Sequence, residues 1–274
     1  MRRKRGLWSA IIFYVLVGFF ILNLLAMVCT VVLDSLSLEW FNSWLPTGLF
    51  TTQWYTFALS DHDLVQLLTN TLIVAIGSTL IALLVGLPAA YVLARKQFRW
   101  KGVLVGIYLL PMLIPPLAYG IPLATVLLKY IGGDLSSVTL INVVPTLPFV
   151  ILILTPFIEQ VDVSLESASR MLGANRLQTF VRVILPLIIP GLLTAGVLAI
   201  VRVIAMFELT YLVADANSGT LVVTLYGDAF AAGMRPEQAI NAMAVIYMLT
   251  TMVLLVVALL FVKPTQFVVR LKGP

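Results

Sequence analysis

Six long runs of mainly apolar residues constrain the fold of this chain more than any other feature. The runs cover about residues 7–32, 66–94, 103–128, 138–158, 188–213 and 239–262. A helix needs about 20 such residues to cross about 30 Å of hydrocarbon, and the runs lack the strict alternation of β-barrel strands. Only 11% of residues are charged, against about 25% in soluble domains. We therefore predict an all-α, polytopic membrane protein with six transmembrane helices. We expect one transmembrane domain over residues 1–274, with span 7–32 preceding a five-helix core at 66–262.

The positions of lysine and arginine predict the orientation of these spans. Fourteen of the 17 bases lie in the segments 1–6, 95–101, 164–182 and 263–272. The intervening loops hold only Lys129 and Arg235, against eight acidic residues from Asp34 to Glu237. Because cytoplasmic loops retain positive charge, both termini are predicted to be cytoplasmic. The bases flank apolar spans, so the net charge of +5 does not indicate a nucleic-acid partner.

Several kinds of chemistry lack the residues that they need. Cys29 is the only cysteine and His62 the only histidine, which excludes an intrachain disulfide and a cysteine-cluster metal site. The sequence has no Gly-Lys-Ser/Thr phosphate loop, no His-Glu-x-x-His and no Gly-x-Ser-x-Gly. We therefore expect no cofactor or metal on this chain and no enzymatic activity of its own. The start, MRRKRG and an apolar run, resembles a signal peptide, but the run is long and lacks a small-x-small cleavage site, so we expect an uncleaved helix.

Prolines are concentrated in the third and fourth apolar runs. They are Pro111, Pro115, Pro116, Pro122, Pro145, Pro148 and Pro156. Each proline removes a backbone donor and favours a kink, which is tolerated at membrane depth where protein or a water-lined cavity satisfies the freed carbonyls. Two interpretations stay open: a translocation path between bent helices, or ordinary kinking for packing.

One mostly polar stretch, SLESASRMLGANRLQTFVRVILP, interrupts the apolar pattern between the fourth and fifth runs. Local signals predict two short helices with a turn between them. Ser164 can cap the first helix, Gly173 suits the left-handed position that ends it, and Asn175 can cap the second, which we expect to run to Pro186. Leu177, Val181 and Ile184 recur at helical spacing, with Arg176 and Arg182 off that stripe. The stretch is either a docking element or a plain loop whose arginines set topology.

This stretch resembles the conserved cytoplasmic loop of permease subunits of binding-protein-dependent ABC importers. That loop typically reads Glu-Ala-Ala, a few residues, Gly, and then a hydrophobic segment ending in Leu-Pro. Gly173, Leu185 and Pro186 match the pattern, with Pro186 thirteen residues after Gly173. The Glu-Ala-Ala positions fall on Ser167, Ala168 and Ser169, with Glu166 one place early.

The similarity covers about residues 50–262. It includes FTTQWYTFAL, TNTLIVAIGSTLIALLVGLPAAYVLARKQFRWKG and LPMLIPPLAYGIPL. RVIAMFELTYLVA, from Arg202 to Ala214, makes the chain most similar to spermidine/putrescine and iron(III) permeases.

The resemblance implies a type I ABC importer permease fold in the bacterial inner membrane. It implies as partners a second permease, two cytoplasmic ATPases that bind the ATP and Mg, and an external solute-binding protein. The polar stretch, within a cytoplasmic coupling loop at residues 162–187, would then contain the helix that couples to an ATPase. The coupling residues would be Glu166, Ser167, Ala168, Ser169, Gly173, Ala174, Leu185 and Pro186. A polyamine is one expected solute, with iron(III), phosphonate, sugar or opine-like solutes left open. An ion-gradient-driven transporter remains the alternative, although its usual related halves are not visible here.

Arg202 and Glu208 are the only charged residues that we place well inside a predicted span. On one ideal helix they would lie about 9 Å apart along the axis and about 120° apart around it. Each would therefore need its own partner, because charges in spans usually face a bundle interior or a water-filled cavity. Glu208, with Thr210 and Tyr211, is predicted to line the translocation path, which Pro115 and Tyr119 complete. In the alternative, both charges lock the span into the permease dimer.

Overall fold

The computed structural model describes residues 7–40, 48, 50–61, 63–230 and 235–261, and every element within them is helical. The helices are α1 (Leu7–Ser35), α2 (Gln53–Asp61), α3 (Leu64–Arg95), α4 (Lys101–Leu113), α5 (Pro116–Tyr130), α6 (Leu135–Glu159), α7 (Val163–Met171), α8 (Arg176–Thr179), the π-helical turn η1 (Phe180–Ile184), α9 (Leu185–Ile204), α10 (Glu208–Val213), α11 (Leu221–Phe230) and α12 (Glu237–Phe261). The predicted all-α class is confirmed. The basic segments 1–6 and 262–274, and His62, lie outside the described residues.

Within the residues that the structure describes, five helical segments are long and apolar enough to cross a membrane. They begin at Ala10, Leu64, Leu135, Arg176 and Glu237, and the bent pair α4 and α5 makes a sixth span if it is counted as one. The six predicted spans therefore each correspond to helical segments. The predicted orientation, with cytoplasmic termini, stays a prediction.

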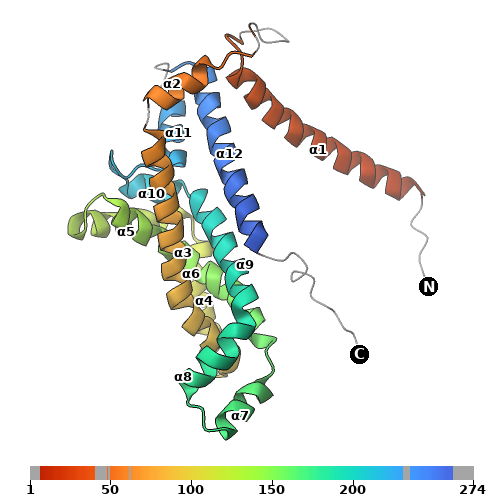
Figure 1. Cartoon of the computed structure of the whole chain (residues 1–274), viewed down its shortest axis with the longest axis vertical. Coiled ribbons are helices and arrows are strands. Elements are labelled where there is room, and N and C mark those ends of the chain that lie inside the picture. The colour runs from red at the N-terminus through yellow and green to blue at the C-terminus, as the bar shows by residue number, and fades with distance from the viewer. Residues whose placement is uncertain (1–6, 41–47, 49, 62, 231–234, 262–274) are drawn as a thin grey trace. The chain divides into compact units, whose positions relative to one another are not determined.

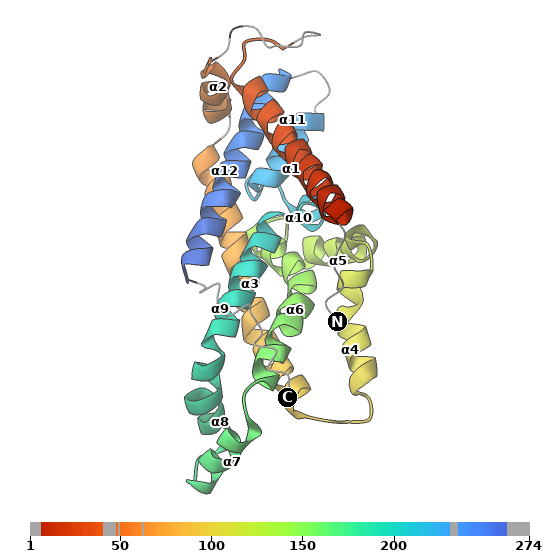
Figure 2. The same ribbon diagram turned by 90° about the vertical axis from the view of Figure 1, so that its right-hand side faces the viewer.

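The third predicted span is not one straight helix. α4 and α5 meet at an angle of 92°, and Figure 2 shows α5 lying across the end of α4. Pro115 and Pro116 lack backbone donors, and a residue before proline is disfavoured in the helical region. Ile114 accordingly has extended backbone angles, with φ −88° and ψ 139°. The proline pair thus divides the third predicted span into two helices that meet at a sharp bend.

The fifth predicted span, 188–213, also has different limits. The helix begins earlier, at Arg176, and runs without interruption through η1 and α9 to Ile204. It stops at Ala205, and α10 begins at Glu208. Our expectation that Arg202 and Glu208 share one ideal helix is therefore wrong, and so is the expectation that the second polar helix ends at Pro186.

The chain divides into two compact units, of which the second contains residues 64–224 and 250–274. The core of this unit is a cluster of side chains from α3, α6 and α9, including Ala82, Val150, Leu154, Ile188 and Ala195. Small residues on these faces let the backbones approach closely, which is how membrane helices gain packing energy. Figure 1 shows α7 and α8 at one end of this unit, beyond the last turn of α6.

The first unit contains residues 1–63 and 225–249. The side chains of α1 that the structure describes are mostly exposed, as expected for a helix surrounded by lipid or by another subunit. Near its end, Asp34 is buried and accepts a hydrogen bond from Asn241 Nδ2 of α12. Trp54 Nε1 of α2 donates to the carbonyl oxygen of Ser37 at 2.7 Å. These polar contacts fix the segment that follows α1.

Candidate functional site

The polar hairpin, residues 162–184, begins with a capped helix. Asp162, rather than Ser164, is the N-cap of α7, and its side chain accepts a hydrogen bond from the Ser164 backbone N–H at 2.8 Å. This bond, with the Ser164 hydroxyl, holds the pKa of Asp162 below its ordinary value. Our assignment of Ser164 as the cap is therefore wrong. Asp162 takes that place because its carboxylate is a strong acceptor for the free donors of the first turn.

The turn of the polar hairpin follows the sequence prediction. Gly173 has φ +86°, a region that side chains resist. Its N–H donates to the carbonyl oxygen of Arg170 at 3.0 Å, and the Ala174 N–H donates to that of Ser169 at 3.2 Å. Asn175 then caps α8 and forms a capping box with Gln178, with bonds of 2.8 and 2.9 Å. The predicted roles of Gly173 in the turn and of Asn175 as the N-cap of the second helix are therefore confirmed.

The tip of the polar hairpin is apolar and exposed. Met171, Leu172 and Leu177 expose 83%, 89% and 71% of their surface. Of the predicted stripe, only Ile184 is buried, and Val181 is exposed along with Leu177. The stripe therefore does not pack wholly on its own chain, and we call Met171, Leu172 and Leu177 the apolar tip.

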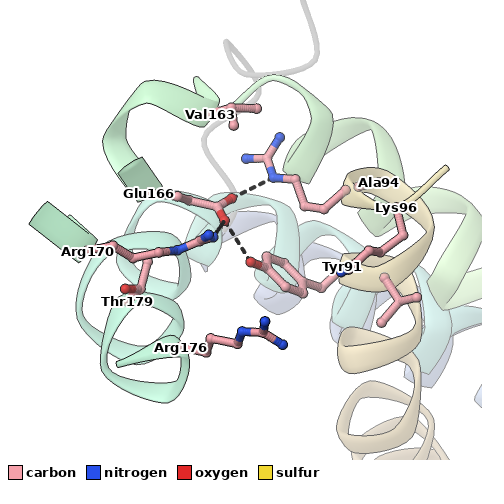
Figure 3. A pocket seen from close by; sticks show the side chains of 10 residues that line it. Tyr91, Ala94, Lys96, Val163, Glu166, Arg170, Arg176 and Thr179 are labelled. Atoms are coloured by element: carbon pink, nitrogen blue, oxygen red, sulfur yellow. Dashed lines mark hydrogen bonds and ion pairs between the residues drawn. The ribbon is translucent and has the colours of Figure 1, made fainter. Parts of the chain in front are cut away.

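The body of the polar hairpin is held by a buried carboxylate (Figure 3). Glu166 is 2% exposed. Its Oε1 accepts from Arg95 Nε at 2.6 Å, and its Oε2 accepts from Tyr91 Oη at 2.8 Å and from Arg170 Nη2 at 3.2 Å. Arg95 Nη2 also donates to the carbonyl oxygen of Val161 at 2.7 Å. Two residues from the last turns of α3 thus fix α7, although α3 is separated from it by more than sixty residues of chain.

A cavity of about 460 Å³ lies between α3 and the polar hairpin. The charged residues that line it are Arg95, Lys96, Glu166, Arg170 and Arg176. A side-chain hydrogen bond between Ser169 Oγ and Thr179 Oγ1, at 3.0 Å, holds α7 to α8. The hairpin is therefore a braced projection rather than a loose connection.

The predicted coupling residues occupy different environments. Glu166 is buried, Ser169, Ala174 and Leu185 are partly buried, and Ser167, Ala168, Gly173 and Pro186 are exposed. The structure brings the residues from Glu166 to Ala174 together in the hairpin, while Leu185 and Pro186 start α9. Sequence reasoning missed the bracing roles of Tyr91 and Arg95, because Arg95 stood out only as one of the bases that set topology.

The residues of the predicted translocation path lie on α5 and α10. Tyr119 is in the first turn of α5, and Pro115 is exposed at the corner before it. Glu208 begins α10, and Tyr211 is 54% exposed. Thr210 is buried and its Oγ1 accepts a hydrogen bond from Asn142 Nδ2 of α6 at 2.9 Å. These residues lie within one unit, but their role in transport stays a prediction.

Comparison with known proteins agrees with this architecture. Residues 82–264 match the family model described as binding-protein-dependent transport system inner membrane component. The molybdate/tungstate transport system permease protein WtpB of Pyrococcus abyssi is 33% identical over 56% of this chain, and the match spans only 64% of that protein's own length. The spermidine/putrescine transport system permease protein PotC of Escherichia coli K12 is 28% identical over 81% of this chain and 80% of its own.

A solved structure gives the same fold. A chain of a bacterial ABC transporter involved in the import of the acidic polysaccharide alginate matches with a TM-score of 0.77 and 19% identity, over 96% of this chain and 99% of that one. The predicted type I ABC importer permease fold is thereby confirmed. Since the family model covers more than half of the residues, the chain belongs to the family of inner membrane components of binding-protein-dependent transport systems.

Proposed function

We propose that this chain is the permease subunit of an ATP-driven importer. It forms the solute path with a second permease, receives solute from an external binding protein, and is driven by two cytoplasmic ATPases. ATP and Mg bind to the ATPases, so this subunit is not itself an enzyme. The observation that carries the proposal is the polar hairpin with its exposed apolar tip.

The geometry of the hairpin suits an ATPase docking element. Large apolar side chains that remain exposed on a polar element mark interaction sites, and an amphipathic helix commonly lays such residues into a groove of its partner. The bond of Glu166 with Arg95 makes the tip rigid relative to α3. Movement of a partner bound at the tip is therefore transmitted to a membrane span.

The charge of the solute is not decided by the relatives. Molybdate is an anion and spermidine is a cation, and proteins named for each resemble this chain. A polyamine remains one candidate, supported by the resemblance to PotC and by the acidic loops on the predicted outer side. We propose a small charged solute.

Substitutions at the apolar tip test the docking role. Leu172→Asp with Leu177→Asp should abolish co-purification of the ATPase and receptor-stimulated ATP hydrolysis, because a charge in an apolar groove is poorly solvated. Gln97→Asp, at an exposed position outside the hairpin, is the matched control and should retain both. Normal ATPase binding by the double variant would refute the docking proposal.

A further inference from the structure

Two opposite charges lie at the break between α9 and α10. Arg202 is in the last turn of α9 and Glu208 is in the first turn of α10. Neither forms an ion pair with the other, or with any other residue that the structure describes. The Arg202 guanidinium lies 5.0 Å from the ring centroid of Phe149. The break explains why both charges are tolerated, since a cation suits a helix C-terminus and an anion a helix N-terminus.

Buried polar atoms without a partner accompany these charges. Within the described part of the chain, Arg202 Nε, Tyr119 Oη and Asn142 Oδ1 are buried and form no hydrogen bond. Asn142 uses its other polar atom, Nδ2, to donate to Val138 O and Thr210 Oγ1. Such atoms are rarely left unsatisfied in a native protein, so each indicates a ligand or a water that completes it.

These groups come together where two broken spans meet. Gly120, next to Tyr119, packs so closely on α10 that an added Cβ would lie 2.6 Å from Leu209 Cδ2. Leu209 is the neighbour of Glu208, so the first turn of α10 packs against α5 beside Tyr119. The corner at Pro115 and the break after Ile204 are therefore adjacent. In other transporters, interrupted helices at membrane depth line the solute site.

The polar groups of Tyr119, Asn142, Arg202 and Glu208 divide by chemistry into two sets. Arg202 Nε–H and Tyr119 O–H are donors, and they suit an anionic group. The Glu208 carboxylate and Asn142 Oδ1 are acceptors, and they suit an ammonium group. A simple cation would leave the donors unsatisfied, and a simple anion would leave the acceptors unsatisfied, so neither complements the whole cluster.

We propose that this cluster of Tyr119, Asn142, Arg202 and Glu208 binds a small zwitterionic solute during its passage. Arg202 and Tyr119 hold the anionic end, and Glu208 and Asn142 hold the amine. The proposal rests on the proposed permease function, and it replaces the polyamine candidate with a zwitterionic substrate class. The cluster thus binds both the anionic and the cationic end of the solute, whereas an isolated carboxylate in the path would bind only the cationic end.

Three probes built on the same two-carbon chain test this assignment. The probes are 2-aminoethanesulfonate, which carries both charges, ethanesulfonate, which carries only the anion, and ethylamine, which carries only the cation. Calorimetric titration of the full chain in its assembled complex in nanodiscs should show the zwitterion binding at least about tenfold more tightly than either singly charged probe, since a probe that lacks one charged end loses one of the two ionic contacts.

Each single substitution should remove the contact with one charged end of the solute. Arg202→Gln should lower the affinity for 2-aminoethanesulfonate to about that for ethylamine, and Glu208→Gln should lower it to about that for ethanesulfonate. Tyr119→Phe deletes one hydroxyl and should keep the fold while weakening binding of the two sulfonates alone. Tyr130→Phe, at a position 74% exposed and outside the cluster, is the control and should change nothing.

Several results would overturn the assignment. They are equal binding of all three probes, no binding of the zwitterion, and zwitterion binding unaffected by Arg202→Gln and Glu208→Gln. Loss of the second permease from either variant would show that the charges belong to a subunit interface instead. Receptor-stimulated ATP hydrolysis by the wild-type complex is measured in parallel, because its absence refutes the permease function independently of what the cluster binds.

Discussion

Removal of the Glu166 carboxylate should loosen the polar hairpin from α3. The side chains of Glu166 and Arg95 are 3% and 9% exposed, so their ion pair is buried. Removing one partner of a buried pair costs about 3–5 kcal/mol, because the other charge stays buried without compensation. The Arg170 side chain is 54% exposed, and its pair with Glu166 should contribute about 0.3–0.5 kcal/mol because solvent screens it.

Hydrogen exchange of the α7 backbone measures this loosening. A loss of about 3–5 kcal/mol in the free energy of local opening corresponds to exchange roughly 100 to 4,000 times faster, at 1.4 kcal/mol per factor of ten. Glu166→Ala should show that change in the reconstituted complex. Arg170→Ala removes the exposed partner alone and should change exchange less than about threefold.

A double-mutant cycle isolates the pair from other effects of each substitution. Glu166→Ala and Arg95→Ala should be far from additive, with a coupling energy above about 1.5 kcal/mol. Independent sites add within about 0.3–0.5 kcal/mol. Additive effects of Glu166→Ala and Arg95→Ala, or an equally large coupling of Glu166 with Arg170, would refute the claim that Arg95 braces the hairpin.

Three further predictions concern the same hairpin. A single cysteine at Asn175 in a Cys29→Ser background should react with an impermeant maleimide only after cells are permeabilised, and labelling of intact cells would reverse the predicted orientation. Gly173→Val forces a side chain into φ +86° at a cost of about 1 kcal/mol or more, so the protein should stay in the membrane but lose most receptor-stimulated ATP hydrolysis. Gly102→Val, with neither positive φ nor a close neighbour, is its control, and equal activity of the two variants would contradict the prediction. The hydrogen bonds that lower the pKa of Asp162 stabilise α7 fully above the carboxyl group's unfolded pKa of about 3.9. Protection of the α7 backbone from hydrogen exchange should therefore hold from pH 7 to about 4 and fall below about pH 4. The Asp162→Asn variant should show no such fall.

The helical spans and the local caps and turns could be predicted because their causes lie within short stretches of the sequence. Apolar runs of about 20 residues determine spans by length. Gly173 and Asn175 determine the turn of the hairpin through their own backbone and side-chain preferences. Ser164 was mistaken for the cap because both it and Asp162 are good capping residues, and only the observed start of α7 distinguishes them.

The site could not be predicted because its contacts join residues far apart in the chain. Nothing near Arg95 in sequence indicates that it pairs with Glu166, 71 positions later. The break after Ile204 contains neither proline nor glycine, so local propensity favours a continuous helix there. Packing decides it instead: Leu209 is fully buried and Thr210 bonds to Asn142 of α6, contacts that exist only once α5, α6 and α10 are assembled.

The sequence by itself therefore determined that this chain is a bundle of membrane helices with a capped, glycine-turned polar hairpin. Tertiary structure alone decided what holds that hairpin and where the interior charges lie. The physical reason is range: caps, turns and hydrophobic length act over a few residues, whereas the partners of a buried carboxylate or guanidinium are supplied by whichever helices pack around it.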